Sequence, residues 1–361
     1  MPVINNLPGR TLSIDNIDLL FFSGTSYLGI GHQETFRKAL YDGFERYGSI
    51  YSASRNNNIQ LGIYQETEKY LAEINDAEAS ITTSSGLLAG QLVVRSFEDH
   101  LFIYAPDVHP ALWFGQNISS QFKDYDDFYS RINDIISKVN IPIVICCNSI
   151  DPLRCEKYNF NWVSSLPQDK DITLIFDDSH ALGLVNLDFE DSKDFKHGFG
   201  NYSFFSALAP DNVRVIVISS LAKALGIPGG IIFGDLDVIN KIKNSPYFIG
   251  ASPIIPAYLD AFMKSQKHYY SFNYRLKENI DLFLSLNNHL LYHFRYLENY
   301  PVFFSPNNDL YQDLMRKNIF ISSFAYPTAE STPITRIVLS SLHTDSDIRI
   351  LSNALNEIFY N

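Results

Sequence analysis

Short apolar runs recur over the first two-thirds of the chain and predict the strands of one sheet. They cover residues 101–104, 141–147, 172–176, 213–218 and 230–233. Apart from Thr173 and Arg214 these runs are apolar, which is typical of strands that are buried on both faces.

Segments with helical spacing of apolar residues lie among these runs, at 63–74, 87–97 and 128–139. In the first of them, Glu66, Glu68 and Lys69 form the polar face. Strands and helices in this order predict an α/β architecture, with a mostly parallel central sheet covered by helices.

The pattern changes in the last third of the chain. Three prolines between positions 246 and 256 precede a long helical stretch over about 258–282. Strand-like runs follow at 301–304 and 336–339, and an amphipathic helix is expected at 345–359, with Asp345 as its N-cap. Mixed short strands and helices of this kind predict a smaller α+β domain.

A length of 361 residues favours two lobes over one hydrophobic core. We expect residues 45–250 to form a large cofactor-binding domain and residues 251–361 a small C-terminal domain. Residues 1–44 are expected to be an N-terminal segment that packs with the small domain.

Composition excludes several classes of function. The net charge is −12 and no dense basic cluster occurs, which disfavours nucleic acid as a partner. The first residues lack a basic start and an apolar signal core, and no run approaches the roughly 18 apolar residues of a spanning helix. No membrane association is expected, and the protein is predicted to be cytoplasmic.

The three cysteines, Cys146, Cys147 and Cys155, do not form a disulfide framework. Two of them are adjacent in an apolar run, so we expect buried, reduced thiols. No paired His and Cys spacing accompanies them, so no metal site is expected.

Two expected strand ends carry the candidate chemistry. The run at 172–176 leads into Asp177, Asp178, Ser179 and His180, and the run at 213–218 leads to Lys223. Open α/β sheets bind ligands at the carboxyl ends of their strands. A pyridoxal-phosphate enzyme needs a lysine that bonds the cofactor aldehyde and an aspartate that keeps the pyridine nitrogen protonated. The sequence therefore predicts pyridoxal 5'-phosphate as cofactor, with Lys223 and Asp177 as catalytic residues.

A phosphate site is expected at Ser85, Gly86 and Leu87. Thr82-Thr83-Ser84-Ser85-Gly86 precedes the apolar helical segment. Small hydroxyl residues and a glycine at a helix start offer backbone N–H groups and the positive end of the helix dipole to an anion. Taken alone, the pattern is that of an ordinary serine-capped helix. Together with Lys223 and Asp177, the same pattern indicates a binding site for the cofactor phosphate.

Three further residues are candidates for contact with the cofactor ring. His109 follows the 101–104 run, where an imidazole can stack on the open face of the cofactor and assist proton transfer. His180 either bonds the ring hydroxyl or is a core histidine. Ser149 either contacts the ring oxygen or belongs to a turn with Asn148 and Pro152.

Together these motifs resemble fold-type I pyridoxal-phosphate enzymes, and within them the α-oxoamine synthases of the 8-amino-7-oxononanoate synthase-like group. The resemblance spans nearly the whole chain. It is carried by Ser26-Tyr27-Leu28-Gly29, by Ser54-Arg55 with Glu68, by Ser85-Gly86-Leu87, by Asp107 to His109, by Asp177 to Gly183, by Ser220 to Gly226, and by Arg336 to Leu339 with His343-Thr344.

The resemblance implies a biosynthetic acyltransferase that condenses a small amino acid with an acyl-CoA through an external aldimine. It places Ser220 where a phosphate-binding hydroxyl would lie, and Arg336 where a guanidinium grips the substrate carboxylate. It also implies a homodimer with shared active sites.

The chain departs from the family pattern at Ser26, where the family has asparagine, and at Ile59 and Tyr64, where it has glycine and histidine. The cofactor motifs are thus kept better than the surroundings related to acyl-CoA. Two alternatives stay open: a pyridoxal-phosphate aminotransferase on the same fold, and a catalytically weakened binding protein.

Overall fold

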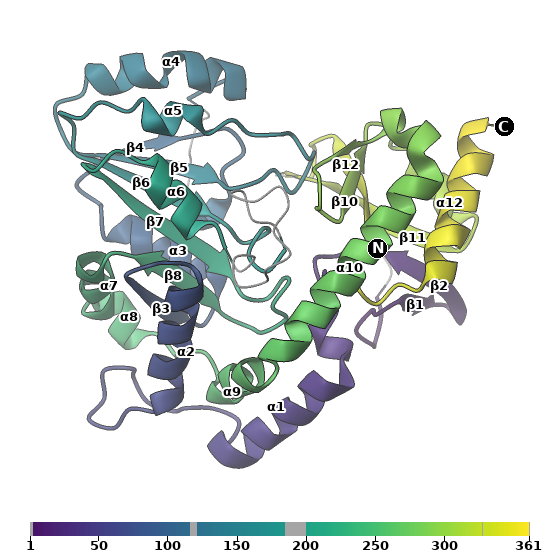
Figure 1. The fold of residues 1–361 in the computed structure, drawn as a ribbon, viewed down its shortest axis with the longest axis horizontal. Helices are drawn as coiled ribbons and strands as arrows, with labels where there is room; N and C mark the ends of the chain where they lie inside the picture. Colours follow the sequence, from purple (N-terminus) through teal and green to yellow (C-terminus); the bar gives the residue numbers. More distant parts are fainter. Residues whose placement is uncertain (1–2, 116–120, 185–199, 327, 361) are drawn as a thin grey trace. The chain divides into compact units, whose positions relative to one another are not determined.

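The computed structural model describes residues 3–115, 121–184, 200–326 and 328–360. Six strands in this part form one sheet in the order β3–β8–β7–β6–β5–β4 (Figure 1). Their bounds are Ala79–Thr83 for β3, Leu101–Tyr104 for β4, Ile143–Asn148 for β5, Ile172–Asp177 for β6, Val213–Ser220 for β7 and Gly230–Gly234 for β8.

Strands β4, β5, β6 and β7 run parallel, and β8 is antiparallel to both β7 and β3. The predicted mostly parallel sheet is therefore confirmed. Every residue of β5 and β6 is buried, as the uninterrupted apolar runs predict for strands covered on both faces.

The three predicted helices of this region are confirmed within three residues at each end. They are α2 at Gly62–Ile74, α3 at Gly86–Arg95 and α4 at Tyr125–Ser137. The other helices of this part are α1 at Glu34–Tyr47, α5 at Asn161–Ser164, α6 at Tyr202–Leu208, α7 at Leu236–Lys243, α8 at Pro246–Gly250, α9 at Pro256–Lys264, and the 3-10 turn η2 at Pro110–Leu112.

A second sheet has the order β1–β2–β11–β12–β10–β9 and is antiparallel except where β2 pairs with β11. Its strands are β1 at Thr11–Ile14, β2 at Ile17–Phe22, β9 at Arg295–Tyr296, β10 at Val302–Ser305, β11 at Ile319–Ala325 and β12 at Pro333–Val338. Its helices are α10 at Gln266–Asn287, α11 at Leu310–Met315 and α12 at Asp345–Tyr360, with 3-10 turns η1 at Ile30–His32 and η4 at Asn288–His293.

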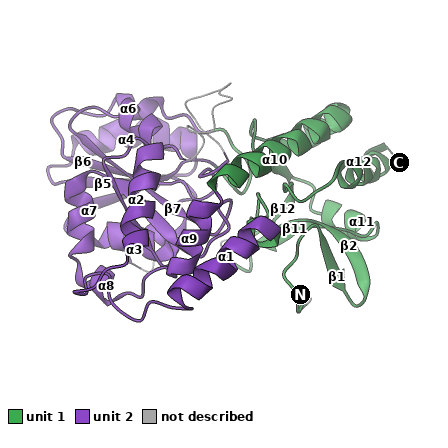
Figure 2. Cartoon of the chain, turned by 60° about the horizontal axis from the view of Figure 1, so that its bottom comes forward, with its two compact units in different colours: residues 1–33, 151–157, 266–361 green, residues 34–150, 158–265 purple. Residues whose placement is uncertain are grey.

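The chain divides into two units, one around each sheet (Figure 2). The larger contains residues 34–150 and 158–265, and the smaller contains residues 1–33, 151–157 and 266–361. The N-terminal strands enter the smaller unit because β2 pairs with β11.

These bounds differ from the expected ranges at three places. Residues 151–157, expected in the large domain, belong to the smaller unit. Residues 34–44 and 251–265 lie in the larger unit, because α1 packs along α9. Gly43 permits this approach, since a Cβ atom there would lie 2.7 Å from the Ala257 carbonyl oxygen.

Two local predictions for the C-terminal third are wrong. The helical stretch over 258–282 is two helices, because α9 ends before Ser265 and α10 starts at Gln266. The N-cap of α12 is Thr344, not Asp345. The Thr344 hydroxyl accepts from the Asp347 N–H at 3.3 Å, and Asp347 Oδ2 accepts from the Thr344 N–H at 2.8 Å. This reciprocal pair is a capping box, which holds the helix start more tightly than a single acceptor.

The cysteines are buried and free, as predicted. Burial raises the pKa of the Cys155 thiol to about 12, so it stays protonated at neutral pH. Among the described helices, none combines the length and the apolar character that crossing a bilayer requires.

Candidate active site

Asp177 is the last residue of β6, between Asn148 at the end of β5 and Ile218 on β7. Its carboxylate is buried, and Oδ1 accepts a hydrogen bond from the Ser179 N–H at 3.0 Å. Its other oxygen, Oδ2, lies 4.0 Å from Nδ1 of His109. The sheet therefore holds one oxygen of a buried carboxylate in place and leaves the other directed toward a histidine.

His109 caps the short turn η2, because its Nδ1 accepts the Ala111 N–H at 3.1 Å. The lone pair of Nδ1 is thus occupied, so the proton of the neutral ring is on Nε2. Burial and the charge of Lys223 lower the pKa of His109, while Asp177 raises it, and the net effect is a lowered pKa. The side chain is 51% exposed. His109 is therefore a neutral, half-open imidazole beside Asp177, not half of an ion pair.

The start of α3 has the geometry expected for anion binding. Ser85 is the N-cap, and its Oγ accepts the Leu88 N–H at 3.1 Å. The N–H groups of Gly86 and Leu87 belong to the first turn, where a helix offers no internal acceptor. The Leu87 side chain is exposed. These two donors, with the dipole of α3 behind them, can face an anion.

Ser220, at the end of β7, lies directly against this turn. A Cβ atom on Gly86 would come within 2.7 Å of the Ser220 Cβ, and one on Gly230 within 2.4 Å of the Ser85 carbonyl oxygen. Only glycine permits these approaches. The close packing gathers the hydroxyls of Ser85 and Ser220 and the start of α3, which is a donor set that fits a phosphate group.

Lys223 lies in the turn that links β7 to β8. Backbone hydrogen bonds from Leu221 N–H to the Gly229 oxygen at 2.9 Å and from Ile227 N–H to the Leu221 oxygen at 3.1 Å close this turn. The lysine is half-buried, and its positive charge contributes to the lowered pKa of His109. The pKa of His109 is thus influenced by both Lys223 and Asp177.

Ser149 and His180 flank the same strand end. The Ser149 N–H donates to the Asp177 carbonyl oxygen at 3.0 Å, and the side chain is fully buried. Its hydroxyl lies close enough to Asp178 to lower the pKa of that carboxyl, but in no well-aligned hydrogen bond. His180 is half-buried, three residues after Asp177.

Asp178 is a buried acid that sequence reasoning did not single out. It is 0% exposed, and its two oxygens accept the Asn201 side-chain amide at 2.8 Å and the Asn201 N–H at 3.3 Å. Burial raises its pKa to about 7, so the site holds a second carboxyl next to Asp177 that ionises far less readily than an exposed aspartate. The available signal was a second aspartate directly after a strand whose other residues are mostly apolar.

Arg336 belongs to the smaller unit, in the middle of β12. It lies opposite Ser322 on β11 and Phe304 on β10. Only 5% of the residue is exposed. One terminal nitrogen donates to the Pro152 carbonyl oxygen, and the guanidinium carbon lies 5.2 Å from the centre of the Phe324 ring.

The Nε of Arg336 has no hydrogen-bond partner among the described residues. A buried guanidinium with a free donor is costly unless it receives an acceptor. A carboxylate fits this need, because it can take two parallel hydrogen bonds from the fork of an arginine.

The residues of the larger unit fit the binding requirements of pyridoxal phosphate. It combines a phosphate-sized donor set at Ser85, Gly86 and Ser220 with a buried carboxylate at Asp177 for the ring nitrogen. A lysine lies within electrostatic reach at Lys223. These are the protein groups that this cofactor requires.

Comparisons with known proteins agree with this result. The model of the family described as aminotransferase class I and II matches residues 124–355, which is 232 of the 361 residues. A putative 8-amino-7-oxononanoate synthase from Rippkaea orientalis is 24% identical over 98% of this chain and 93% of its own length. The serine palmitoyltransferase of Sphingobacterium spiritivorum is 26% identical over 70% of this chain and 62% of its own.

Solved structures show the same fold. A serine palmitoyltransferase from S. paucimobilis with a bound PLP derivative covers 99% of this chain and 92% of its own, with a TM-score of 0.80 and 13% identity. An 8-amino-7-oxononanoate synthase from Francisella tularensis covers 95% and 98%, with a TM-score of 0.68 and 18% identity. The resemblance drawn from the motifs is thereby confirmed, and so are the fold class and the cofactor. With most of its length matched by the family model and its strand ends arranged for pyridoxal phosphate, the chain belongs to the aminotransferase class I and II family of pyridoxal-phosphate-dependent transferases.

Proposed function

We propose that this enzyme is an acyltransferase of the α-oxoamine synthase type, which condenses a small amino acid with an acyl-CoA. The observation that supports this most directly is its similarity, over 98% of the chain, to proteins named 8-amino-7-oxononanoate synthase. Similarity to a serine palmitoyltransferase points to the same class of reaction. The enzyme is proposed to act in the cytoplasm.

Bound pyridoxal phosphate supplies an aldehyde that bonds amines and a protonated ring that withdraws electrons from the substrate α-carbon. In this proposal the N–H groups of Gly86 and Leu87 and the hydroxyls of Ser85 and Ser220 bind its phosphate. Asp177 Oδ2 accepts a hydrogen bond from the protonated pyridine nitrogen, and this choice is supported by Oδ1 being engaged by Ser179.

Lys223 has two tasks. Its Nζ would hold the cofactor covalently in the resting enzyme, and as a free amine it would remove and return the proton at the substrate α-carbon. A lysine can attack only when neutral, and the cationic ring nearby favours the neutral form. Its placement in a turn closed by backbone hydrogen bonds supports a fixed position for Nζ.

His109 is proposed to stack on the open face of the cofactor ring and to assist proton transfer. Because its Nδ1 is held by Ala111, the group it offers is the Nε2–H, which can donate to a substrate oxygen. His180 and Ser149 are proposed to lie on the ring-hydroxyl side. The burial of Ser149 beside Asp178 supports a second role for it there, as a partner of that acid.

Arg336 is proposed to bind the carboxylate of the amino acid, and the free Nε of its buried guanidinium supports this. A homodimer with shared active sites is part of the same proposal and follows from the family resemblance.

The cofactor role is tested by colour. Lys223→Ala protein and the wild-type chain are each mixed with pyridoxal phosphate, dialysed and reduced with borohydride. Wild-type protein should turn yellow and keep the reduced cofactor covalently, whereas the variant should not. Equal covalent labelling of both would contradict the role of Lys223.

The reaction is tested with the loaded enzyme, single amino acids and acyl-CoA, with free thiol followed over time. Release of thiol that depends on an amino acid supports condensation. Conversion of the cofactor to its amine form, reversed by 2-oxo acids, would show an aminotransferase instead. Neither response to any amino acid would favour a binding protein.

A further inference from the structure

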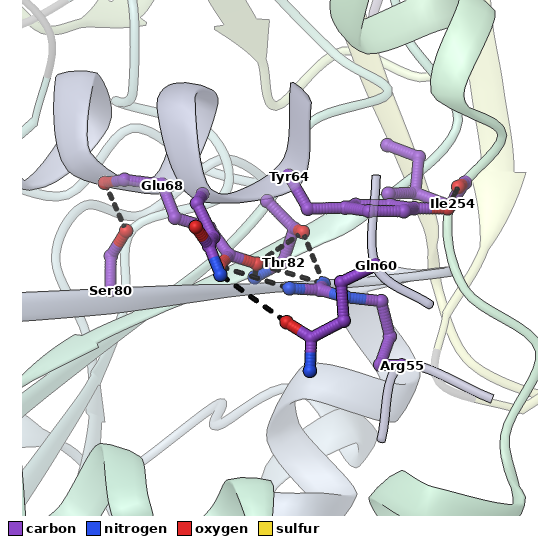
Figure 3. Close-up of polar contacts among 8 residues, drawn as sticks. Arg55, Gln60, Tyr64, Glu68, Ser80, Thr82 and Ile254 are labelled. Carbon is purple, nitrogen blue, oxygen red and sulfur yellow. Dashed lines mark hydrogen bonds and ion pairs between the residues drawn. The ribbon is translucent and has the colours of Figure 1, made fainter. Parts of the chain in front are cut away.

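Glu68 of α2 seals the outer edge of β3, the strand that leads into the phosphate-binding turn (Figure 3). Its Oε1 accepts both the Thr82 N–H at 2.8 Å and the Thr82 hydroxyl at 2.7 Å. Its carbonyl oxygen accepts the Ser80 hydroxyl at 2.7 Å. An edge strand has N–H groups without a neighbouring strand, and Glu68 accepts one of them, the Thr82 N–H.

Arg55 holds Glu68 in place. Its two terminal nitrogens donate to the two carboxylate oxygens of Glu68 at 2.9 and 3.0 Å, and one of them also lies 3.2 Å from the Thr82 hydroxyl oxygen. The guanidinium carbon lies 4.1 Å from the centre of the Tyr64 ring and 5.7 Å from that of Phe248. Arg55 is 8% exposed, so this two-pronged pair is buried and rigid.

Tyr64 extends the cluster to a third segment. Its hydroxyl donates to the Ile254 carbonyl oxygen at 2.8 Å, as Figure 3 shows. Helix α2, strand β3 and the segment before α9 are therefore fixed at one point within the larger unit.

The cluster is two residues from the phosphate-binding turn. Thr83 follows Thr82, and its hydroxyl donates to the Ser85 carbonyl oxygen at 2.9 Å. That same oxygen is the atom against which Gly230 packs. Hydrogen bonds thus run without interruption from Arg55 and Glu68 to Thr82, and the next residue bonds the turn itself.

We infer that Arg55 and Glu68 are positioning residues for the cofactor phosphate. They do not contact the cofactor, but they fix the end of β3 and so aim the N–H groups of Gly86 and Leu87. The inference rests on the proposed use of this turn. A purely structural ion pair would stabilise the fold without affecting one part of the ligand more than another.

The test compares two forms of the cofactor. Pyridoxal phosphate and pyridoxal, which lacks the phosphate, are titrated into wild-type, Glu68→Gln and Thr82→Val proteins, and binding is read from absorbance. We expect the variants to bind pyridoxal phosphate about tenfold more weakly, as is typical when a group behind a ligand-binding residue is lost. Binding of pyridoxal should change by less than about twofold. Thr82→Val keeps the side-chain volume, so it tests the idea even where Glu68→Gln fails to fold.

Glu73→Gln is the matched control, because Glu73 forms an exposed pair with Lys69 on the same helix. It should leave both affinities unchanged. Equal weakening of both ligands by the Thr82 variant, or no weakening, would overturn the inference. If the wild-type chain bound neither ligand, the proposed function would be overturned together with this inference. If the wild-type chain bound both ligands and only the variants behaved otherwise than expected, this inference alone would fail.

Discussion

Gly86 lies against Ser220 so closely that a methyl group at position 86 would come within 2.7 Å of the Ser220 Cβ and 2.9 Å of its Cα. Neither atom belongs to a flexible side-chain end, so α3 and β7 would have to separate. The approach joins the two halves of the proposed phosphate site, one from each element.

Gly86→Ala is therefore expected to weaken pyridoxal phosphate binding and to destabilise the fold by about 1–3 kcal/mol, the usual cost of overpacking. Equilibrium titration and urea unfolding measure the two effects. Gly62→Ala is the control, since no atom lies within 4 Å of a Cβ at Gly62. A Gly86→Ala protein that binds the cofactor as tightly as wild type would contradict the close-packed site.

Arg336→Ala should reduce affinity for the amino acid while cofactor occupancy holds. A loss of about 2–5 kcal/mol is typical when one partner of a buried charged pair is removed. Affinity is read from the spectral change on adding amino acids to the loaded enzyme. Arg295→Ala is the control, because Arg295 is on strand β9 of the same sheet and pairs with Glu156 at the surface. Equal affinities in the Arg336 variant and wild type would refute carboxylate binding by Arg336.

Asp178 should make the protein less stable as pH rises from about 4 to 7. Its pKa is raised to about 7 in the fold, so the folded state keeps a proton that the unfolded state loses near its ordinary value of 3.8. The contribution of Asp178 to the free energy of unfolding is then greatest below pH 4 and declines up to pH 7, by an amount on the order of 4 kcal/mol.

The measurement is urea unfolding of the cofactor-free protein at several pH values in this range. As pH rises, the free energy of unfolding of Asp178→Asn should decline less than that of wild type. The control Asp169→Asn, at an exposed position, should show the same pH dependence as wild type. Parallel curves for wild type and Asp178→Asn would show that this acid is ionised in the fold.

Much of the larger unit could be predicted from sequence because its strands are buried on both faces. A run such as 172–176 is predicted as a buried strand because its residues are apolar except Thr173, and threonine is itself favoured in strands. The strand ends then place Asp177 and Lys223 by topology alone. Asp178 shows where this reasoning stops, since its partner Asn201 comes from a distant segment that no local pattern connects to it.

The smaller unit was harder to predict because its sheet is built by pairing between strands that are far apart in the sequence. Strand β2 joins β11, about 300 positions later, and no periodicity within the N-terminal segment indicates this partner. The N-cap of α12 is a similar case. Asp345 suits the position by type, but Thr344 holds it because Asp347 completes the capping box.

His343 shows how a residue from a recognised motif can be structural. Its Nδ1 accepts the Ser340 N–H at 3.0 Å, and its Nε2 lies 3.0 Å from the Phe21 carbonyl oxygen, to which it donates. The neutral ring satisfies both contacts, and a second proton on Nδ1 would break the bond to Ser340. Burial lowers the pKa of His343 to about 4.

The contribution of His343 to stability should therefore be lost as pH falls from about 6.5 to 4, because the unfolded chain takes up a proton at this residue that the folded chain refuses. This effect is opposite in sign to that of Asp178 over the same range, so each is read from the difference between wild type and its own variant. The loss from this residue is on the order of 3 kcal/mol, which is the pKa difference expressed as free energy. Urea unfolding at pH 7 and pH 4.5 should show a smaller loss for His343→Gln than for wild type. The exposed His289→Gln variant should behave as wild type does. A wild-type protein and a His343→Gln variant that lose equal stability over this range would mean that His343 is already protonated in the fold.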